Sequence, residues 1–175
     1  MAEKAPLVGI VLGSANDWPK VQGAAEVLEQ FGIAYEVSVM SAHRTPTDVA
    51  EYASRAAQRG LKVLIGAAGG AAHLAGVLAA HTILPVIGIP VPTELAGGLD
   101  SLLSMVQMPG DVPVAVVGTN SGGPRNAGLL AVQILALNQP ELQEKLLQFK
   151  QKLAEKVRAA HVSLQAQLAR STPTS

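Results

Sequence analysis

The stretch that decides the fold is residues 63–91, VLIGAAGGAAHLAGVLAAHTILPVIGIPV. It holds two short apolar runs, at residues 63–67 and 85–91, and the first of them ends at the turn Gly69-Gly70. Short apolar runs bounded by turn residues are typical of buried parallel strands. The small apolar residues between the runs predict a helix over residues 71–81. The stretch therefore predicts a strand–helix–strand unit of a parallel sheet.

The same stretch carries no formal charge, so a membrane span has to be considered. Gly69-Gly70, His73, His81 and Pro85 interrupt it, and alanine and glycine favour membrane insertion much less than leucine or isoleucine. We therefore expect no membrane association. Small residues let backbones approach closely, so we expect this segment to be buried partly by its own domain and partly by other subunits.

The alternation of strand and helix extends outward on both sides of this unit. Further strands are predicted at residues 7–12, 34–40 and 113–117, and further helices at residues 17–32, 45–60, 100–107 and 125–137. Asp17 and Thr45 stand at the N-cap positions of two of these helices. Five strands alternating with helices predict a three-layer α/β fold, a doubly wound, flavodoxin-like parallel sheet.

The C-terminal part has a different pattern. Apolar residues recur every three or four positions over residues 141–170, which predicts one long helix with a single apolar face. We expect a single domain of 175 residues: an α/β part at residues 1–140, a helix that packs in an oligomer, and a frayed tail at residues 171–175.

Composition excludes several classes of protein. Thirteen basic and thirteen acidic residues cancel, which argues against a nucleic-acid-binding protein. No cysteine is present, so disulfide scaffolds and thiolate zinc sites are excluded. The first residues, MAEKAP, show no secretory signal, and we expect a cytoplasmic protein. Five aromatic residues in the chain disfavour flavin stacking.

Polar residues gather where three predicted strands end. In a sheet of order 2-1-3-4-5 a ligand lies beyond the carboxyl ends of the strands, between the first and the third. The loops nearest to that point are residues 13–17, 41–46 and 68–73, and they carry hydroxyls, two imidazoles, a carboxylate and a guanidinium. The sequence therefore predicts the ligand site at these three loops.

Each of these residues is also compatible with a purely structural role. Gly13-Ser14 before a helix either offers N–H groups and a hydroxyl to an anion or makes only a tight turn. Arg44 suits a phosphate monoester, or else forms a surface ion pair. Asp17 binds a ribose hydroxyl, caps its helix, or does both. No nucleotide-triphosphate or dinucleotide fingerprint is present.

The histidines have the same two interpretations. His43 lies in a polar loop, where a solvated histidine is the commoner case, and His73 follows the Gly-Gly turn. His81 and His161 look structural or solvated. No histidine or carboxylate pair has metal-ligand spacing, so we expect no metal site.

Taken together, five motifs resemble the N5-carboxyaminoimidazole ribonucleotide mutase family, the small catalytic subunit type of phosphoribosylaminoimidazole carboxylase. The motifs are GSANDW at residues 13–18, SAHRTP at 41–46, GGAAHL at 69–74, DSLLSMVQMP at 100–109 and NAGLLAVQIL at 126–135. Arg44-Thr45 after the histidine resembles the bacterial and plant mutase branch. The branch that uses free CO₂ has Lys-Gly there.

The resemblance implies which residues form the site. It implies His43 as the catalytic residue, and as substrate-binding residues Ser14, Asn16, Asp17, Ser41, Arg44, Gly69, His73 and Leu74, with no metal and no cofactor. Asn16 stands where the family usually has a serine, Ala75 and Val77 replace a proline and a methionine, and the loop at residues 118–125 is one residue longer than usual.

The resemblance further implies a phosphoribosyl aminoimidazole substrate and a homooctamer with active sites at subunit junctions. The implied reaction moves a carboxylate from N5 to C4 of the substrate in de novo purine (IMP) biosynthesis, by decarboxylation and recarboxylation with one histidine as proton shuttle. Two alternatives stay open at this point. They are a CO₂-dependent aminoimidazole ribonucleotide carboxylase of the same fold and a non-catalytic module that binds a phosphorylated metabolite.

Overall fold

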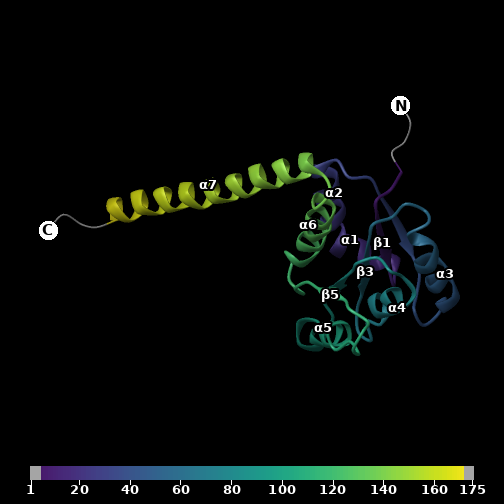
Figure 1. Cartoon of the computed structure of the whole chain (residues 1–175). Helices are drawn as coiled ribbons and strands as arrows, with labels where there is room; N and C mark the ends of the chain where they lie inside the picture. Colours follow the sequence, from purple (N-terminus) through teal and green to yellow (C-terminus); the bar gives the residue numbers. More distant parts are fainter. Residues whose placement is uncertain (1–4, 172–175) are drawn as a thin grey trace. The chain divides into compact units, whose positions relative to one another are not determined.

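A computed structural model of the chain describes residues 5–171 (Figure 1). Its centre is a parallel sheet with strand order β2-β1-β3-β4-β5. The strands are β1 (Val8–Leu12), β2 (Tyr35–Val39), β3 (Val63–Ala68), β4 (Val86–Pro90) and β5 (Ala115–Val116). This order confirms the predicted doubly wound sheet. The chain first adds β2 on one side of β1 and then adds β3, β4 and β5 on the other side, so the strand order reverses between β1 and β3.

Helices cover both faces of the sheet. They are α1 (Trp18–Val21), α2 (Gly23–Phe31), α3 (Pro46–Ala56), α4 (Leu74–His81), α5 (Leu99–Val106), α6 (Gly123–Ala136) and α7 (Pro140–Ser171), with short 3₁₀ turns at Ala15–Asp17 and Leu95–Gly97. Side chains of α3, α4 and α5 form one buried cluster with β1 and β3. Right-handed crossovers place α2 and α6 on the opposite face, where Gly128 of α6 packs against Ala24 of α2.

The three central strands are apolar because both of their faces are covered. Every residue of β1, β3 and β4 is buried, whereas the edge strand β2 is only partly buried. Gly66 in β3 lets α4 come close to the sheet, since an added Cβ there would lie 3.0 Å from the Cα of Ala75. The continuous apolar runs in the sequence therefore correspond to strands buried on both sides.

The predicted N-caps differ from those in the structure. The helix expected over residues 17–32 is divided into a 3₁₀ turn, α1 and α2, and the Asp17 side chain makes no capping hydrogen bond. Thr45 does stand before α3, but its hydroxyl bonds the backbone of Ser41 instead of the helix. At Thr45 the loop competes for the hydroxyl that would otherwise cap the helix. Asp17 already has helical backbone angles, whereas a capping residue has an extended backbone.

Several predicted elements are shorter in the structure. The helix expected over residues 45–60 ends at Ala56, and β2 and β4 each lose one residue at both ends. The fifth strand, expected over residues 113–117, has only two residues, because it lies at an edge and pairs with β4 alone. The helix expected from residue 71 begins at Leu74, since residues 71–73 form turns. The stretch at residues 63–91 is buried in its strands, whereas parts of α4 and the following turn are exposed, Ile83 most of all.

The chain divides after Leu135 into two compact units, and α7 belongs to the second. The predicted long helix is confirmed, and its residues 151–169 are all exposed. The predicted frayed tail lies outside the described residues, except for Ser171, which ends α7. The single-domain organisation stays a prediction. Among the described helices, none combines the length and the apolar character that a bilayer crossing requires.

The close packing at Gly66 gives a prediction about stability. Gly66→Ala would bring a methyl group within 3.1 Å of the Ala75 and Leu78 side chains, and such overpacking typically costs about 1–3 kcal/mol. We expect a lower urea midpoint at fixed protein concentration. Gly110→Ala is the matched control, because an added Cβ there meets no atom within 4 Å. Equal midpoints for the two variants would contradict the packing argument.

Candidate active site

The predicted ligand site corresponds to a pocket at the carboxyl ends of three neighbouring strands. Leu12, near the end of β1, is in register with Val39 of β2 and with Ala67 of β3. The three following loops therefore leave the sheet side by side. They enclose a cavity of about 170 Å³ together with the first residue of α4. Its lining residues are Gly13, Ser14, Asp17, Ser41, Ala42, His43, Arg44, Ala68, Gly69, Ala71, His73 and Leu74.

The first loop is held by a serine at its N-terminal end. Ser14 has an extended backbone and its Oγ accepts the N–H of Asn16 at 3.3 Å. The N–H of Asp17 donates to the Ser14 carbonyl at 3.1 Å, which closes the 3₁₀ turn. Burial raises the pKa of the Asp17 carboxyl, and the charge of Lys20 partly offsets this effect. The loop thus presents a hydroxyl and a carboxylate to the cavity.

The second loop is fixed by its own side chains. The Thr45 hydroxyl accepts the N–H of Ser41 at 3.0 Å and lies 3.3 Å from the Ser41 carbonyl. In return, Ser41 Oγ accepts the backbone N–H of Arg44 at 3.2 Å. These bonds connect the two ends of a five-residue loop, so the side chains of His43 and Arg44 project from a backbone that is already restrained.

The elements on either side of this loop are also joined. Tyr52 of α3 donates its hydroxyl to Glu36 Oε1 of β2 at 2.7 Å, and Arg59 pairs with the other carboxylate oxygen. Burial and the hydrogen bond to Glu36 raise the pKa of Tyr52 well above its usual value, so this tyrosine remains a donor. The contact ties α3 to the edge strand that precedes the loop.

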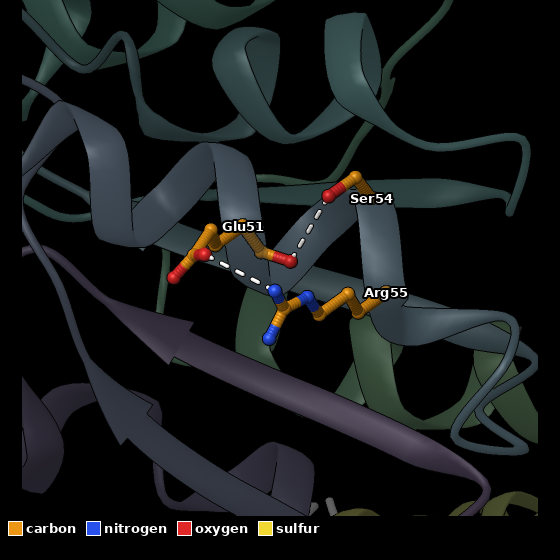
Figure 2. A network of polar contacts seen from close by, with 3 residues as sticks. All are labelled: Glu51, Ser54 and Arg55. Atoms are coloured by element: carbon orange, nitrogen blue, oxygen red, sulfur yellow. Dashed lines mark hydrogen bonds and ion pairs between the residues drawn. The ribbon is translucent and has the colours of Figure 1, made fainter.

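Arg44 is held in place without a carboxylate partner. Its guanidinium lies 3.4 Å from Ser41 Oγ through Nε and donates to the Gly13 carbonyl through Nη2 at 3.3 Å. Within residues 5–171 it forms no ion pair. Arg55 behaves differently, because it pairs with Glu51 one turn earlier on α3, as Figure 2 shows. The positive charge of Arg44 is therefore oriented but not neutralised, as a binding site for an anion requires.

The third loop carries the second histidine of the site. It turns at Gly70, whose backbone is in the left-handed region with φ of +70°, and reaches His73 at the start of α4. His73 Nδ1 lies 2.8 Å from His43 Nε2, and the two rings meet edge to face. One nitrogen donates and the other accepts, so the pair shares one proton along this contact. Two residues 30 apart in sequence thus form one hydrogen-bonded pair.

Two other kinds of ligand site would be a metal cluster and a hollow near Lys20 and Arg125, and within the described residues neither has free charged groups like those of the site cavity. In the part of the chain that the structure describes, no three histidine, aspartate or glutamate side chains gather as metal ligands would. A larger hollow of about 430 Å³ lies near Lys20 and Arg125. Lys20 donates to the Pro92 carbonyl and Arg125 pairs with Glu26, so both cations there already have partners.

The structure brings together eight of the nine residues expected at the site. Asn16 is the exception: it lies in the first loop but does not line the cavity. The glycines and alanines of residues 66–80 already predict a small apolar lining, and Ala68 and Ala71 belong to that stretch. Sequence reasoning missed Ala42, because alanine has no chemical group that would single it out.

Known proteins are similar in sequence to this chain over most of their length. The model of the AIR carboxylase family matches residues 7–156. A Synechocystis protein named N5-carboxyaminoimidazole ribonucleotide mutase is 54% identical over 87% of this chain and 86% of its own. The Mycobacterium tuberculosis protein of the same name is 52% identical over 94% of this chain and 93% of its own.

Solved structures agree with these relatives. The crystal structure of Treponema denticola PurE superposes with a TM-score of 0.83 and 29% sequence identity, covering 91% of this chain and 98% of that one. The agreement of the family model, the relatives and the fold over nearly the whole length leads to one conclusion. The chain belongs to the AIR carboxylase family.

Proposed function

We propose that this protein catalyses the reaction for which its relatives are named, the conversion of N5-carboxyaminoimidazole ribonucleotide to 4-carboxy-5-aminoimidazole ribonucleotide. The observation that carries the proposal is the arrangement of one cavity. It holds an unpaired guanidinium, a carboxylate and a bonded pair of imidazoles beside small apolar side chains. As an enzyme of purine biosynthesis, the protein is expected in the cytoplasm.

The polar groups suit the two ends of such a nucleotide. We assign the phosphate to Arg44, Ser14 and Ser41, because a fixed guanidinium with neighbouring hydroxyls makes short, charge-assisted hydrogen bonds. The Asp17 carboxylate, which lines the same cavity and shares the first loop with Ser14, accepts from a ribose hydroxyl. The base then lies toward His43 and His73, beside Gly69 and Leu74.

His43 carries the proton in the proposed mechanism. The carbamate C–N bond breaks to release CO₂, and the imidazolium of His43 protonates the nitrogen that keeps the bonding electrons. C4 then attacks CO₂ to form the new carbon–carbon bond, and the now neutral imidazole removes the proton from C4. Imidazole suits both steps because its ordinary pKa lies near neutrality. Protons balance over the cycle, so no cofactor is consumed.

The apolar part of the cavity suits the intermediate CO₂. Ala42, Ala68, Ala71 and Leu74 line it, and Ala68 and Leu74 are almost fully buried. A neutral molecule held between the two chemical steps needs a pocket that attracts no water. Alanine and leucine side chains provide such a surface beside the imidazoles.

The assay that tests the function uses purified protein and the N5-carboxylated substrate without ATP or bicarbonate. We expect carboxylation at C4 by the wild type, and a fall in turnover of at least about 10²-fold in His43→Asn, since asparagine cannot transfer a proton at neutral pH. His81→Asn, an exposed histidine at the end of α4, serves as control and is expected to keep its activity.

Two outcomes of this assay would count against the proposal. Turnover that depends on added bicarbonate would identify a CO₂-dependent carboxylase instead. Binding of the nucleotide without any turnover would identify a non-catalytic module. Near-normal activity of His43→Asn would remove that residue from the mechanism while leaving the reaction itself intact.

The phosphate assignment gives a separate binding prediction. Arg44→Ala should weaken binding of the nucleotide by about 1.5–3 kcal/mol in calorimetry, the scale of a charge-assisted contact. The dephosphorylated nucleoside should bind the wild type about as poorly. Arg55→Ala removes an arginine that is already paired with Glu51 and should change little. Equal binding of nucleoside and nucleotide by the wild type would refute the assignment.

We further propose that the protein is a homooctamer whose copies complete each other's sites. A cavity of 170 Å³ is small beside the roughly 300–1,000 Å³ of typical ligand pockets. A second, mainly apolar hollow also has His73 in its lining, together with Val77, Leu103 and Met108. On α7, Leu153, Val157 and Leu164 lie on one helical face and are about half exposed or more. These apolar surfaces support self-association.

Light scattering tests the proposed assembly. We expect full-length protein at micromolar concentration to show eight times the chain mass of 18.0 kDa. Val157→Glu places a charge on the apolar face of α7 and should reduce the assembly, because each buried side chain of this size contributes about 1.5–3 kcal/mol. Gln151→Glu adds the same charge away from that face and serves as control. An active monomer would overturn the proposal.

A further inference from the structure

Two serines of α5 bind one residue of the third site loop. Ser101 Oγ accepts the N–H of Gly70 at 2.9 Å and donates to the Val91 carbonyl at 2.8 Å. Ser104 Oγ lies 3.1 Å from the Gly70 carbonyl. The Ser104 hydroxyl has one proton and shares it between the Gly70 carbonyl and the Asp100 carbonyl, which lies closer at 2.8 Å. Both polar groups of Gly70 thus face hydroxyls of a helix that begins about 30 residues later in the chain, and the bond to Ser101 is the undivided one.

Ser101 is an unusual residue for its position. It is fully buried, and it is the one polar residue of the described chain with that degree of burial. Its hydroxyl is nevertheless fully used, with one hydrogen bond donated and one accepted. A small apolar residue would pack on the sheet equally well, so the position is explained by its contacts with Gly70 and Val91.

The environment of Ser101 supports the same function. Asp100 accepts the backbone N–H of Ser101 at 2.8 Å and the hydroxyl of Thr93 at 2.6 Å, so the first turn of α5 is attached to the segment that follows β4. The hydrogen bond from Thr93 lowers the pKa of the Asp100 carboxyl, which stays ionised and acts as an acceptor. The helix that holds Gly70 is therefore itself fixed.

Gly70 sets the position of His73. Its φ of +70° turns the chain, and its carbonyl also accepts the N–H of Ala72 at 2.8 Å. One further turn, from the Ala71 carbonyl to the N–H of His73 at 2.9 Å, leads directly to the imidazole. Only two residues and two hydrogen-bonded turns separate Gly70 from His73, so a displaced Gly70 displaces His73.

His73 in turn contacts His43 at 2.8 Å. Which of the facing nitrogens carries the proton depends on ring orientation, and a change of a few tenths of an ångström alters the bond. The contacts thus form one continuous path from α5 to the imidazole pair: Ser101 and Ser104, Gly70, His73 and His43.

We propose that Ser101 and Ser104 are positioning residues for the histidine pair. They hold the Gly70 turn so that His73 orients His43 and selects its tautomer. The effect of the two serines on the contact between His73 and His43 does not depend on which reaction the protein catalyses. The consequence of that effect for turnover rests on the proposed function. The competing explanation is that the serines only attach α5 to the sheet, in which case their loss lowers stability without changing the imidazoles.

Spectroscopy of the imidazole nitrogens separates the two explanations, because the chain has only four histidines. In long-range ¹H–¹⁵N spectra of the full-length protein at one pH, Ser104→Ala should shift the signals of His43 and His73 and leave His81 and His161 unchanged. Ser104→Thr keeps the hydroxyl and should resemble the wild type. Ser101→Ala should give the same shifts.

The matched control is Ser54 on α3. Its hydroxyl donates to the Glu51 carbonyl at 3.1 Å, as drawn in Figure 2, which is the same kind of bond within a helix that Ser104 makes to Asp100 at 2.8 Å. Ser54 is not among the residues that line the site cavity, so Ser54→Ala should leave the signals of His43 and His73 unchanged; it lies near His81, whose signal is not part of this comparison. If Ser104→Ala and Ser54→Ala shift the His43 and His73 signals equally, the shift comes from the loss of a hydrogen bond within a helix. That result would overturn the proposal.

A second variant tests the path if Ser104→Ala folds poorly. Gly70→Ala strains the turn through its φ of +70°, and its added Cβ meets no atom within 4 Å. It should shift the same two histidines. Unchanged signals of His43 and His73 in every variant that folds would overturn the proposal.

Kinetics then connect the path to turnover. We expect kcat of Ser104→Ala to fall about ten- to a hundred-fold, as small misplacements of catalytic groups do, with KM changed less than two-fold. Shifted histidine signals in a protein whose wild type shows no mutase activity would refute the proposed function and leave the positioning intact. Shifted signals with unchanged kcat would refute the proposed effect on catalysis.

Discussion

The parallel pairing of β1 with β2 on one side and β3 on the other is the constraint on which the rest of the structure depends. Leu12 is in register with Val39 and with Ala67, so three loops leave the sheet at one place. All five residues of β1 are buried, and a slip by one residue would place every side chain in a packing site shaped for another, as at Gly9, where an added Cβ would collide with Tyr52. Burial of this strand therefore fixes the location of the site.

The loops at that place are restrained by hydrogen bonds that do not belong to helices or strands. Thr45 joins the ends of the second loop, and the serines of α5 hold Gly70 in the third. Such contacts matter because a loop without them would sample many conformations. In the proposed mechanism one imidazole gives a proton to nitrogen and later takes one from C4, and both transfers need fixed geometry. At Arg44 a restrained backbone is combined with a side-chain charge that no carboxylate of the described chain neutralises.

Much of this arrangement could be predicted from the sequence. The apolar runs predicted the buried strands, and the loops with Ser14, His43 and His73 followed from their ends. The division of the helix after β1 and the contact of Thr45 with Ser41 could not be predicted. A polar side chain beside a helix start has several partners of similar energy, and the choice among them depends on the exact path of the loop.

The sequence by itself determined which residue types stand at the strand ends and the order of strands and helices, because periodicity and turn residues are local properties of the chain. Only the tertiary structure decided that His43 bonds His73, that Arg44 has no carboxylate partner within the described chain, and that Ser101 binds Gly70. The bonded pairs join residues 30 and 31 positions apart. Their distances are fixed by crossovers between strands and by helix packing, which no local pattern encodes.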